Sequence, residues 1–225
     1  MLKRVLFLFL ILFNLSFSIH ADKSPFDTPS WYEFFQAIAV RDVEQIKEIL
    51  DSSTDVNIRF FDDKKGQTPL MLADATNVVK LLLSRGADVM LKDDVGSTAL
   101  HYNVNRDNAL EVLPLLIKKG ADVNAKTTKY NEAPIMFAKE WFFGNDANKG
   151  KEVMKLLIDA GADINTKDES GYTLLLYAAV NEKPELVKFL INNGANKNIK
   201  SEDGKTPLDY ARELKYPDII KLLDK

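Results

Sequence analysis

The clearest pattern in the chain is an apolar run with helical spacing that ends, each time, at a glycine. Val79-Lys80-Leu81-Leu82-Leu83 stands just before Gly86, and Val187-Lys188-Phe189-Leu190-Ile191 stands just before Gly194. Such spacing predicts an amphipathic helix, and the glycine predicts its end because glycine adopts the left-handed conformation at little cost. The ending recurs at intervals of 34, 41 and 33 residues. The glycines are Gly86, Gly120 and Gly161, each in Gly-Ala-Asp, and Gly194, in Gly-Ala-Asn.

A second recurring signature predicts the start of another helix in each unit. It is clearest in Thr68-Pro69-Leu70-Met71 and in Thr206-Pro207-Leu208-Asp209, and Thr98 and Thr173 stand at the same position in other units. A threonine hydroxyl caps a helix well, and proline fits the first helical position because its missing N–H has no partner there. The chain is therefore predicted to repeat a pair of helices. Such a unit must stack on its neighbours to bury its apolar face.

A period of about 33 residues with a Thr-Pro-Leu motif resembles the ankyrin repeat. The resemblance covers nearly everything after residue 29. It implies an all-α solenoid of stacked helix-turn-helix units with β-hairpin-like fingers between them. It also implies that the fingers and the first helices form a concave face, which in this family usually binds a protein partner. Six units are predicted, of which the first and last are atypical: about 29–60, 64–93, 94–127, 131–168, 169–201 and 202–225.

The first residues have the layout of a secretory signal peptide rather than of a repeat. Lys3 and Arg4 precede a run of apolar residues over 5–13, and we expect cleavage between Ala21 and Asp22, with a second possible frame at Ser16-Phe17-Ser18. Residues 22–28 are then a short linker, and the mature chain has a net charge of −5. The sequence predicts a periplasmic or secreted protein, like an exported bacterial ankyrin-repeat protein. The alternative is an uncleaved inner-membrane anchor over residues 5–19, although a spanning helix needs about 20 apolar residues.

Composition narrows the chemistry that the chain can perform. The 225 residues hold no cysteine and two histidines, which argues against thiolate metal sites, disulfides and cysteine nucleophiles. A net charge of −3 argues against nucleic-acid binding. The stretch from Gly144 to Lys151 departs from a phosphate loop in its spacing and lacks the final Ser or Thr. We therefore expect no cofactor, no metal site, no catalytic residue and no nucleic-acid partner.

Three further sets of polar residues are expected to have structural roles. His101 stands in the family's Thr-Pro-Leu-His position, where the resemblance implies a hydrogen bond between adjacent loops. The acidic pairs Asp62-Asp63 and Asp93-Asp94 are interpreted as solvated turn residues of the fingers. Four asparagines at one repeat position suit the tight turn that leads into the next finger. They are Asn57, Asn124, Asn165 and Asn198.

The units depart from the regular length at a few places. From the threonine position to the glycine, unit two has 18 residues and unit four has 28, against 21 in unit five. Unit two thus lacks about a turn between its helices, and unit four carries an insertion. Pro114 lies within the second helix of unit three, where we expect a kink or a late start. The insertion and two fingers carry aromatic residues, which are the candidate partner-binding anchors: Phe60, Phe61, Tyr130, Trp141, Phe142 and Phe143.

The leading hypothesis is an exported, non-enzymatic binding module, monomeric on its own and free of the membrane after cleavage. It would present its concave face to a protein partner. An N-terminally tethered adaptor or assembly factor for an envelope enzyme is the alternative. A hydrolase with its site in the unit-four insertion is a remote one. For Trp141 and Phe142, the competing interpretation is that the side chain folds back onto the first helix and extends the core.

Overall fold

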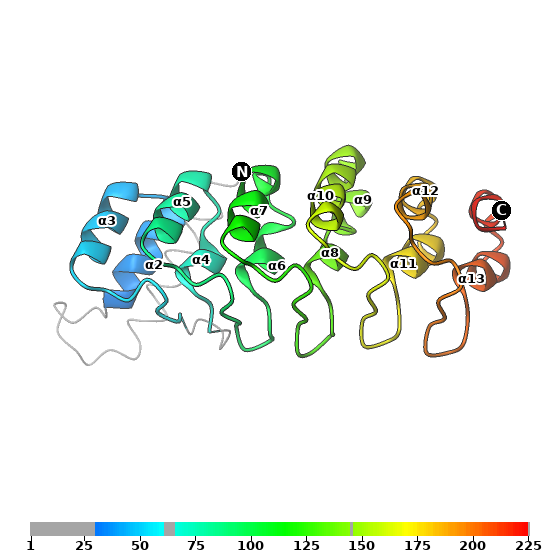
Figure 1. Cartoon of the computed structure of the whole chain (residues 1–225), viewed down its shortest axis with the longest axis horizontal. Coiled ribbons are helices and arrows are strands. Elements are labelled where there is room, and N and C mark those ends of the chain that lie inside the picture. The colour runs from blue at the N-terminus through cyan, green and yellow to red at the C-terminus, as the bar shows by residue number, and fades with distance from the viewer. Residues whose placement is uncertain (1–29, 61–65, 145, 225) are drawn as a thin grey trace, which may run out of the picture.

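The computed structural model describes residues 30–60, 66–144 and 146–224, and within them it holds thirteen helices and no β-strand. This confirms the predicted all-α stack (Figure 1). Each of the six predicted unit ranges contains one helix pair, and unit four contains an additional short helix, α9. The helices are α2 (Ser30–Val40), α3 (Val43–Asp51), α4 (Pro69–Leu72), α5 (Thr76–Ser84), α6 (Ala99–Asn103), α7 (Ala109–Lys118), α8 (Pro134–Phe137), α9 (Glu140–Phe143), α10 (Ala147–Asp159), α11 (Leu174–Val180), α12 (Pro184–Asn192), α13 (Pro207–Glu213) and α14 (Pro217–Leu223).

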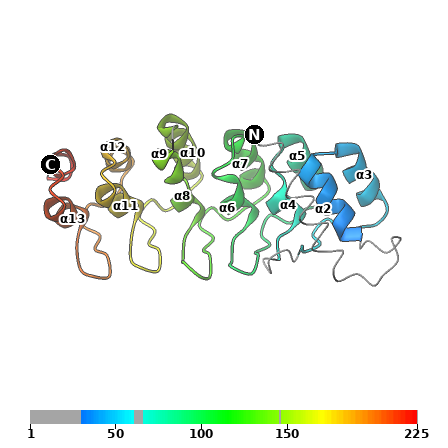
Figure 2. The ribbon, with the colours of Figure 1, turned by 180° about the vertical axis from the view of Figure 1, so that it is seen from behind.

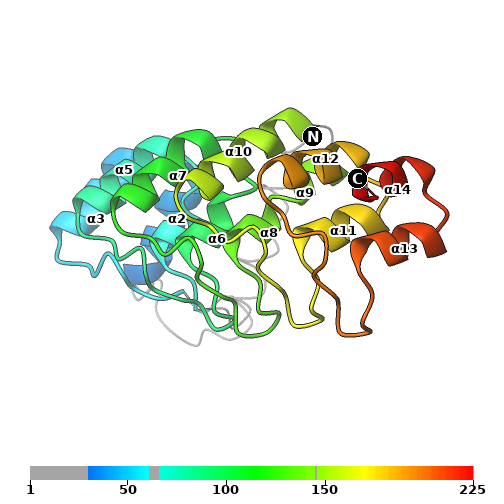
Figure 3. The ribbon, with the colours of Figure 1, turned by 45° about the vertical axis from the view of Figure 1, so that its right-hand side comes forward.

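The helices form two rows along the stack. The first helices of the units, α2, α4, α6, α8, α11 and α13, lie in one row (Figure 2). The second helices, α3, α5, α7, α10, α12 and α14, lie in the other, and the fingers extend on the side of the first helices (Figure 3). The core lies between the rows and between successive units. In α12, for example, Leu186, Val187 and Leu190 are fully buried, and their spacing places them on one face of the helix.

Local signals begin and end the helices largely as the sequence indicates. The Thr173 hydroxyl accepts a hydrogen bond from the backbone N–H of Leu176 at 3.3 Å, and the Thr206 hydroxyl accepts one from Asp209 at 3.2 Å. Gly161 has φ +93° after α10, and a Cβ there would meet nothing within 4 Å. The glycine is therefore required by the left-handed backbone and not by a lack of space.

The repeated asparagines have a role beyond the turn that their position predicts. The Asn57 side-chain oxygen accepts a hydrogen bond from the backbone N–H of Asp88 at 2.8 Å, one unit further along the stack. Asn124 accepts in the same way from Asp163 at 2.9 Å. The tie across unit four forms despite its insertion, so the insertion leaves the stacking register intact. Asn165 and the backbone N–H of Asn196 make the equivalent bond at 2.8 Å.

Met90 occupies the asparagine position in unit two and cannot make this tie. Its backbone nevertheless matches, since its N–H donates to the Asp88 carboxylate at 2.8 Å, as that of Asn124 does to Asp122 at 2.9 Å. The Met90 side chain is 50% exposed. We expect Met90→Asn to raise the free energy of unfolding by about 1 kcal/mol, the worth of one added hydrogen bond. Urea denaturation followed by circular dichroism measures this. Met90→Ser, which is too short to bridge the units, is the control, and an equal gain in both variants would contradict the assignment.

The fingers are also joined by basic side chains at one repeat position. Lys126 Nζ donates to the carbonyl oxygen of Lys167 at 2.7 Å, and Lys167 Nζ donates to that of Lys200 at 2.9 Å. Arg59 and Lys92 reach the next finger in the same way, at 2.6 and 3.3 Å. These cations therefore help to hold neighbouring fingers in register.

Unit two compensates for its missing turn with a residue of unit three. Its first helix, α4, ends after Leu72, and the guanidinium of Arg106 donates to the carbonyls of Met71 (2.8 Å), Leu72 (3.2 Å) and Ala73. These are carbonyls that the next helical turn would otherwise satisfy. In unit three, α7 begins at Ala109 and continues through Pro114, so the expected late start of this helix is wrong.

Candidate functional site

Two of the six predicted anchors lie in the core. Phe60 is only 3% exposed, and its ring packs against those of Trp31, Phe34 and Phe35 at centroid distances of 6.4, 6.3 and 5.7 Å. Phe142 is 7% exposed. An exposed binding role is therefore wrong for these two side chains, because the atypical first unit and the insertion use them to cover apolar surface. Phe61 lies outside the described residues.

Trp141 ties the unit-four insertion to unit three. Its indole N–H donates to the carbonyl of Val104, at the end of α6, at 3.0 Å. Lys149 lies over the ring at 4.7 Å from the centroid and donates to the carbonyl of Asp107 at 2.6 Å. A Cβ added to Gly150 would lie 2.7 Å from atoms of both Phe142 and Trp141, so a glycine is needed for this close approach. The insertion therefore folds back and extends the core, as the competing interpretation states.

Tyr130 and Phe143 are the predicted anchors that the structure leaves exposed. Tyr130 is 46% exposed and Phe143 is 39% exposed. A lysine lies near each ring: Lys129 Nζ is 4.9 Å from the centroid of Tyr130, and Lys183 Nζ is 5.2 Å from that of Phe143. Both remain candidates for partner contact.

A row of aromatic side chains lies along the first helices and was not singled out from the sequence. We call it the aromatic row, and its members are Tyr102, Phe137, Tyr177 and Tyr210, which lie on α6, α8, α11 and α13. Each is half-buried and stands four residues after the threonine position of its unit. The signal was present in the sequence as one aromatic at the same position of four successive units. The helices that carry these rings form the row on the finger side of the stack (Figure 3).

Carboxylates of the fingers hold two of these tyrosines. The Tyr102 hydroxyl donates to Asp93 Oδ2 at 2.6 Å, and the Tyr177 hydroxyl donates to Asp168 Oδ2 at 2.6 Å. Burial, helped by the carboxylate, raises the pKa of Tyr102 to about 12, and the same causes raise the pKa of Tyr177 well above its usual value. Both phenols therefore stay neutral and act as donors. The row is fixed to the fingers by short hydrogen bonds.

Asp93 is not the solvated turn residue that we expected. It is buried, and its Oδ1 accepts the backbone N–H groups of Val95 at 3.0 Å and Ser97 at 2.8 Å. Asp168 does the same in its own finger with Ser170 and Tyr172, both at 2.9 Å. The carboxylate thus closes the turn at the fingertip with one oxygen and holds a ring of the aromatic row with the other. Asp62 and Asp63 lie outside the described residues.

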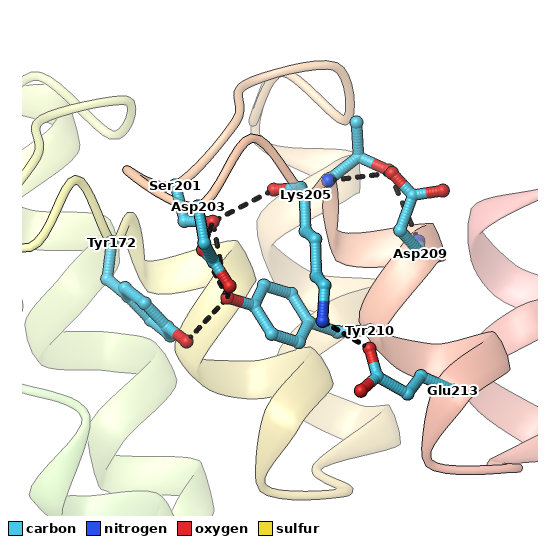
Figure 4. Close-up of polar contacts among 8 residues, drawn as sticks. Tyr172, Ser201, Asp203, Lys205, Asp209, Tyr210 and Glu213 are labelled. Atoms are coloured by element: carbon cyan, nitrogen blue, oxygen red, sulfur yellow. Dashed lines mark hydrogen bonds and ion pairs between the residues drawn. The ribbon is translucent and has the colours of Figure 1, made fainter.

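In the last two units, the carboxylate of a finger holds a tyrosine of the aromatic row that is also bonded to a second tyrosine (Figure 4). Tyr210 Oη lies 2.7 Å from both carboxylate oxygens of Asp203 and accepts a hydrogen bond from the Tyr172 hydroxyl at 2.9 Å. Hydrogen bonds from Ser201 and Tyr210 lower the pKa of Asp203, and burial together with Tyr210 raises the pKa of Tyr172 to about 12. Lys205 lies over the Tyr210 ring at 5.4 Å.

The lysines beside the row are paired, so the face presents little uncompensated charge. Lys139 Nζ lies 4.9 Å from the centroid of Tyr177 and forms an ion pair with Glu132 at 3.0 Å. Lys205 forms an ion pair with Glu213 at 2.5 Å, which raises its pKa. The hydrogen bonds to the fingers and these lysines therefore hold rings of the row in fixed orientations. Such rings lose little conformational entropy when they bind.

His101 is buried between two units. Its Nδ1 accepts the backbone N–H of Thr98 at 3.0 Å, and its Nε2 lies 3.3 Å from the carbonyl oxygen of Glu132 in the next finger. These partners require a proton on Nε2 and none on Nδ1, hence a neutral ring. Burial lowers the pKa of His101 to about 4. The Thr98 hydroxyl also lies 2.9 Å from Nδ1, and the imidazole links the loops of two units.

The unit-four insertion borders a hollow of about 370 Å³, where the hydrolase alternative would place its site. The carboxylates around it, Asp107, Glu140 and Asp146, are all exposed. Two of them are contacted by Lys149, whose ammonium lies 3.8 Å from Asp107 and whose backbone N–H donates to Asp146 at 2.9 Å. In the described part of the chain, no group of three His, Asp or Glu side chains could hold a metal ion. The hydrolase alternative is left without a supporting arrangement.

Comparison with known proteins agrees with this architecture. The family model described as ankyrin repeats (3 copies) matches residues 34–127 and 143–225. The ankyrin repeat, SAM and basic leucine zipper domain-containing protein 1 of Homo sapiens is 34% identical over 112 residues, which make up 47% of this chain and 23% of that protein. Its counterpart in Loxodonta africana is 34% identical over 122 residues, 51% of this chain and 25% of that protein. The chain thus spans about a quarter of the length of these curated relatives.

Solved structures of bacterial ankyrin domains match over a larger share of both chains than these relatives do. An ankyrin repeat domain from Acinetobacter baumannii AYE has a TM-score of 0.70 and 30% identity, and the match covers 85% of this chain and 96% of that one. A second solved ankyrin repeat protein has a TM-score of 0.70 and 29% identity, with 86% and 96% covered. Such repeats typically form protein-interaction modules and are generally non-catalytic scaffolds. The family match, the helix pairs and the fingers together show that the chain belongs to the ankyrin-repeat family.

Proposed function

We propose that the chain is a non-enzymatic protein-interaction module that binds a protein partner through its concave face. The observation that carries this proposal is the aromatic row, in which four rings from successive units line one face at one repeat position. Tyrosine rings supply a large part of the binding energy at protein interfaces. Their hydroxyls are already bonded to Asp93, Asp168 and Asp203, so a partner meets rings that are fixed in advance.

Affinity capture with crosslinking from the native cells tests the binding face. The bait is the full chain, compared with Tyr177→Ala/Tyr210→Ala and with the matched control Tyr177→Phe/Tyr210→Phe, which keeps the rings. We expect the wild type and the phenylalanine variant to enrich the same protein and the alanine variant to lose it, with circular dichroism showing all three folded. Equal enrichment by a folded alanine variant would place the interface elsewhere.

We further propose that the protein is exported and acts in the periplasm or outside the cell. The support is the arrangement of Lys3, Arg4 and the apolar residues 5–13 ahead of Ala21. These residues lie outside the described part of the chain. None of the helices over residues 30–60, 66–144 and 146–224 has the length and apolar character needed to cross a membrane.

The alternative is a tethered adaptor or assembly factor whose residues 5–19 stay in the inner membrane. Mass spectrometry of the protein purified from its native envelope separates the two. A mature N-terminus at Asp22 supports export, and an intact chain recovered from the membrane fraction supports the tether. Binding at the concave face is compatible with both, so this measurement and the capture experiment are independent.

A further inference from the structure

A hollow of about 440 Å³ lies between the second helices of units two and three. Helices α5 and α7, whose residues line it, run next to each other in the row of second helices, on the side of the stack away from the fingers (Figure 3). Apolar side chains of Leu83 and Leu115 line it, and three lysines surround them. The lining residues are Lys80, Leu83, Ser84, Leu115, Lys118 and Lys119.

The charge around this hollow is uncompensated. Lys80, Lys118 and Lys119 are exposed, and none of them forms an ion pair with another residue of the described ranges. Acidic groups on the same side are engaged elsewhere: Glu111 accepts the Thr76 hydroxyl at 2.8 Å, and Asp51 pairs with Arg85 at 2.7 Å. No carboxylate lines the hollow, so it carries three positive charges on a chain whose net charge is −3.

The adjacent pair Lys118 and Lys119 is a feature of unit three. Lys118 and Lys119 stand two and one residues before the glycine of unit three. The equivalent positions hold Asp159-Ala160 in unit four and Asn192-Asn193 in unit five. In unit two, the equivalent positions hold Ser84 and Arg85. The Ser84 hydroxyl donates to the carbonyl of Leu81 at 2.7 Å. The repeat therefore does not demand cations at these two positions, whereas Lys80 stands at a position that also holds Lys155, Lys188 and Lys221.

We propose that the hollow is a second docking site, which takes an acidic segment of a partner protein carrying a large apolar side chain between carboxylates. The apolar side chain would contact Leu83 and Leu115, and the carboxylates would meet the surrounding ammonium groups. Complementary charge at the rim raises the rate of association and selects the partner. The shape favours a protein segment over a membrane, because the apolar residues line a hollow and do not protrude, so a flat bilayer surface does not reach them.

The test uses the full chain and a fluorescein-labelled acidic peptide with a Leu-Phe pair flanked by glutamates. We expect saturable binding by fluorescence anisotropy that weakens with added salt. Lys80→Glu/Lys118→Glu should weaken it about tenfold or more. Lys188→Glu/Lys221→Glu, which reverses two exposed lysines on α12 and α14, should leave it unchanged. Leu115→Ser should weaken it without altering the charge. Protection of Lys80, Lys118 and Lys119 from acetylation, read by mass spectrometry, locates the peptide.

Several outcomes would overturn the proposal. They are no binding at millimolar peptide, equal weakening by both double variants, or a folded Leu115→Ser variant with unchanged affinity. Vesicles of phosphatidylglycerol and of phosphatidylcholine distinguish the other source of negative charge. Binding to the anionic vesicles alone, without binding of the peptide, would replace the partner protein with a membrane. The aromatic row lies on the opposite side of the stack, so these variants do not alter the interface proposed above.

Discussion

Lowering the pH from 7 to 4 is expected to remove about 3 kcal/mol from the free energy of unfolding through His101 alone. Burial lowers the pKa of this histidine from 6.5 to about 4 in the folded protein. Between these two values the unfolded chain binds a proton that the folded chain does not. The stability that the neutral His101 ring contributes to the folded protein is therefore fully present above pH 6.5, and it is lost as the pH falls toward 4. Protonation of Nδ1 would also set an N–H against the N–H of Thr98, which now donates to it.

His101→Met provides the comparison, since Met71 occupies the same position in unit two and accepts the backbone N–H of Thr68 at 3.4 Å. The variant should be about 1 kcal/mol less stable than the wild type at pH 7, because the carbonyl of Glu132 loses one donor. It should be the more stable of the two at pH 4, because it has no group at this position that gains a proton. Urea denaturation at pH 7, 5.5 and 4 measures both effects. The assignment would be wrong if the two proteins lost the same stability on acidification.

Replacing Arg106 with methionine is expected to cost about 3 kcal/mol. The guanidinium donates to three carbonyls at the end of α4, and hydrogen bonds to a charged donor contribute about 1.5–3 kcal/mol each before desolvation is deducted. The cost of desolvating the guanidinium must be subtracted, because Arg106 is buried enough that desolvation lowers its pKa. Arg106→Lys keeps the charge but not the planar fork, so it should recover only part of the loss.

Arg41→Met is the matched control for this experiment. Arg41 also contacts a neighbouring unit, through Asp74 at 2.7 Å, but both side chains are largely exposed. Its loss should cost less than about 1 kcal/mol. Chemical denaturation of the wild type and the three variants gives the ranking. Similar losses in Arg106→Met and Arg41→Met would show that the carbonyls of unit two do not depend on Arg106.

The sequence predicted the parts of the fold that depend on neighbours within one unit. Thr206, Pro207 and Gly194 act through the backbone conformation of their own helix end, so the same residue signals the same structure wherever it recurs. The helix pairs and the all-α class followed from such local signals. The role of Arg106 could not be predicted in this way, because it depends on carbonyls that lie in the preceding unit.

The binding surface was harder to predict because exposure depends on what covers a side chain. Phe60 and Phe142 are aromatic residues of a finger and an insertion, where exposed anchors are expected. In the folded chain, Trp31 packs against Phe60 and Gly150 lies close to Phe142. The residues next to them in the sequence do not indicate these contacts. The aromatic row, by contrast, was visible as a repeated position. It was overlooked because a tyrosine within an apolar helix looks like a core residue until its partner carboxylate, such as Asp168, is located.

The folded-back insertion also sets the order in which the stack opens. Terminal units of a repeat array have one neighbour and fray first, and opening then proceeds inward. Unit four is held from both directions, since Trp141 reaches back to Val104 and Lys151 reaches forward to Glu185 at 3.2 Å. The indole bond is half-buried and the ion pair is exposed, so the insertion strengthens chiefly the contact between units three and four. Opening of the last unit would displace only the ring on α13, and the three rings on α6, α8 and α11 would keep their positions.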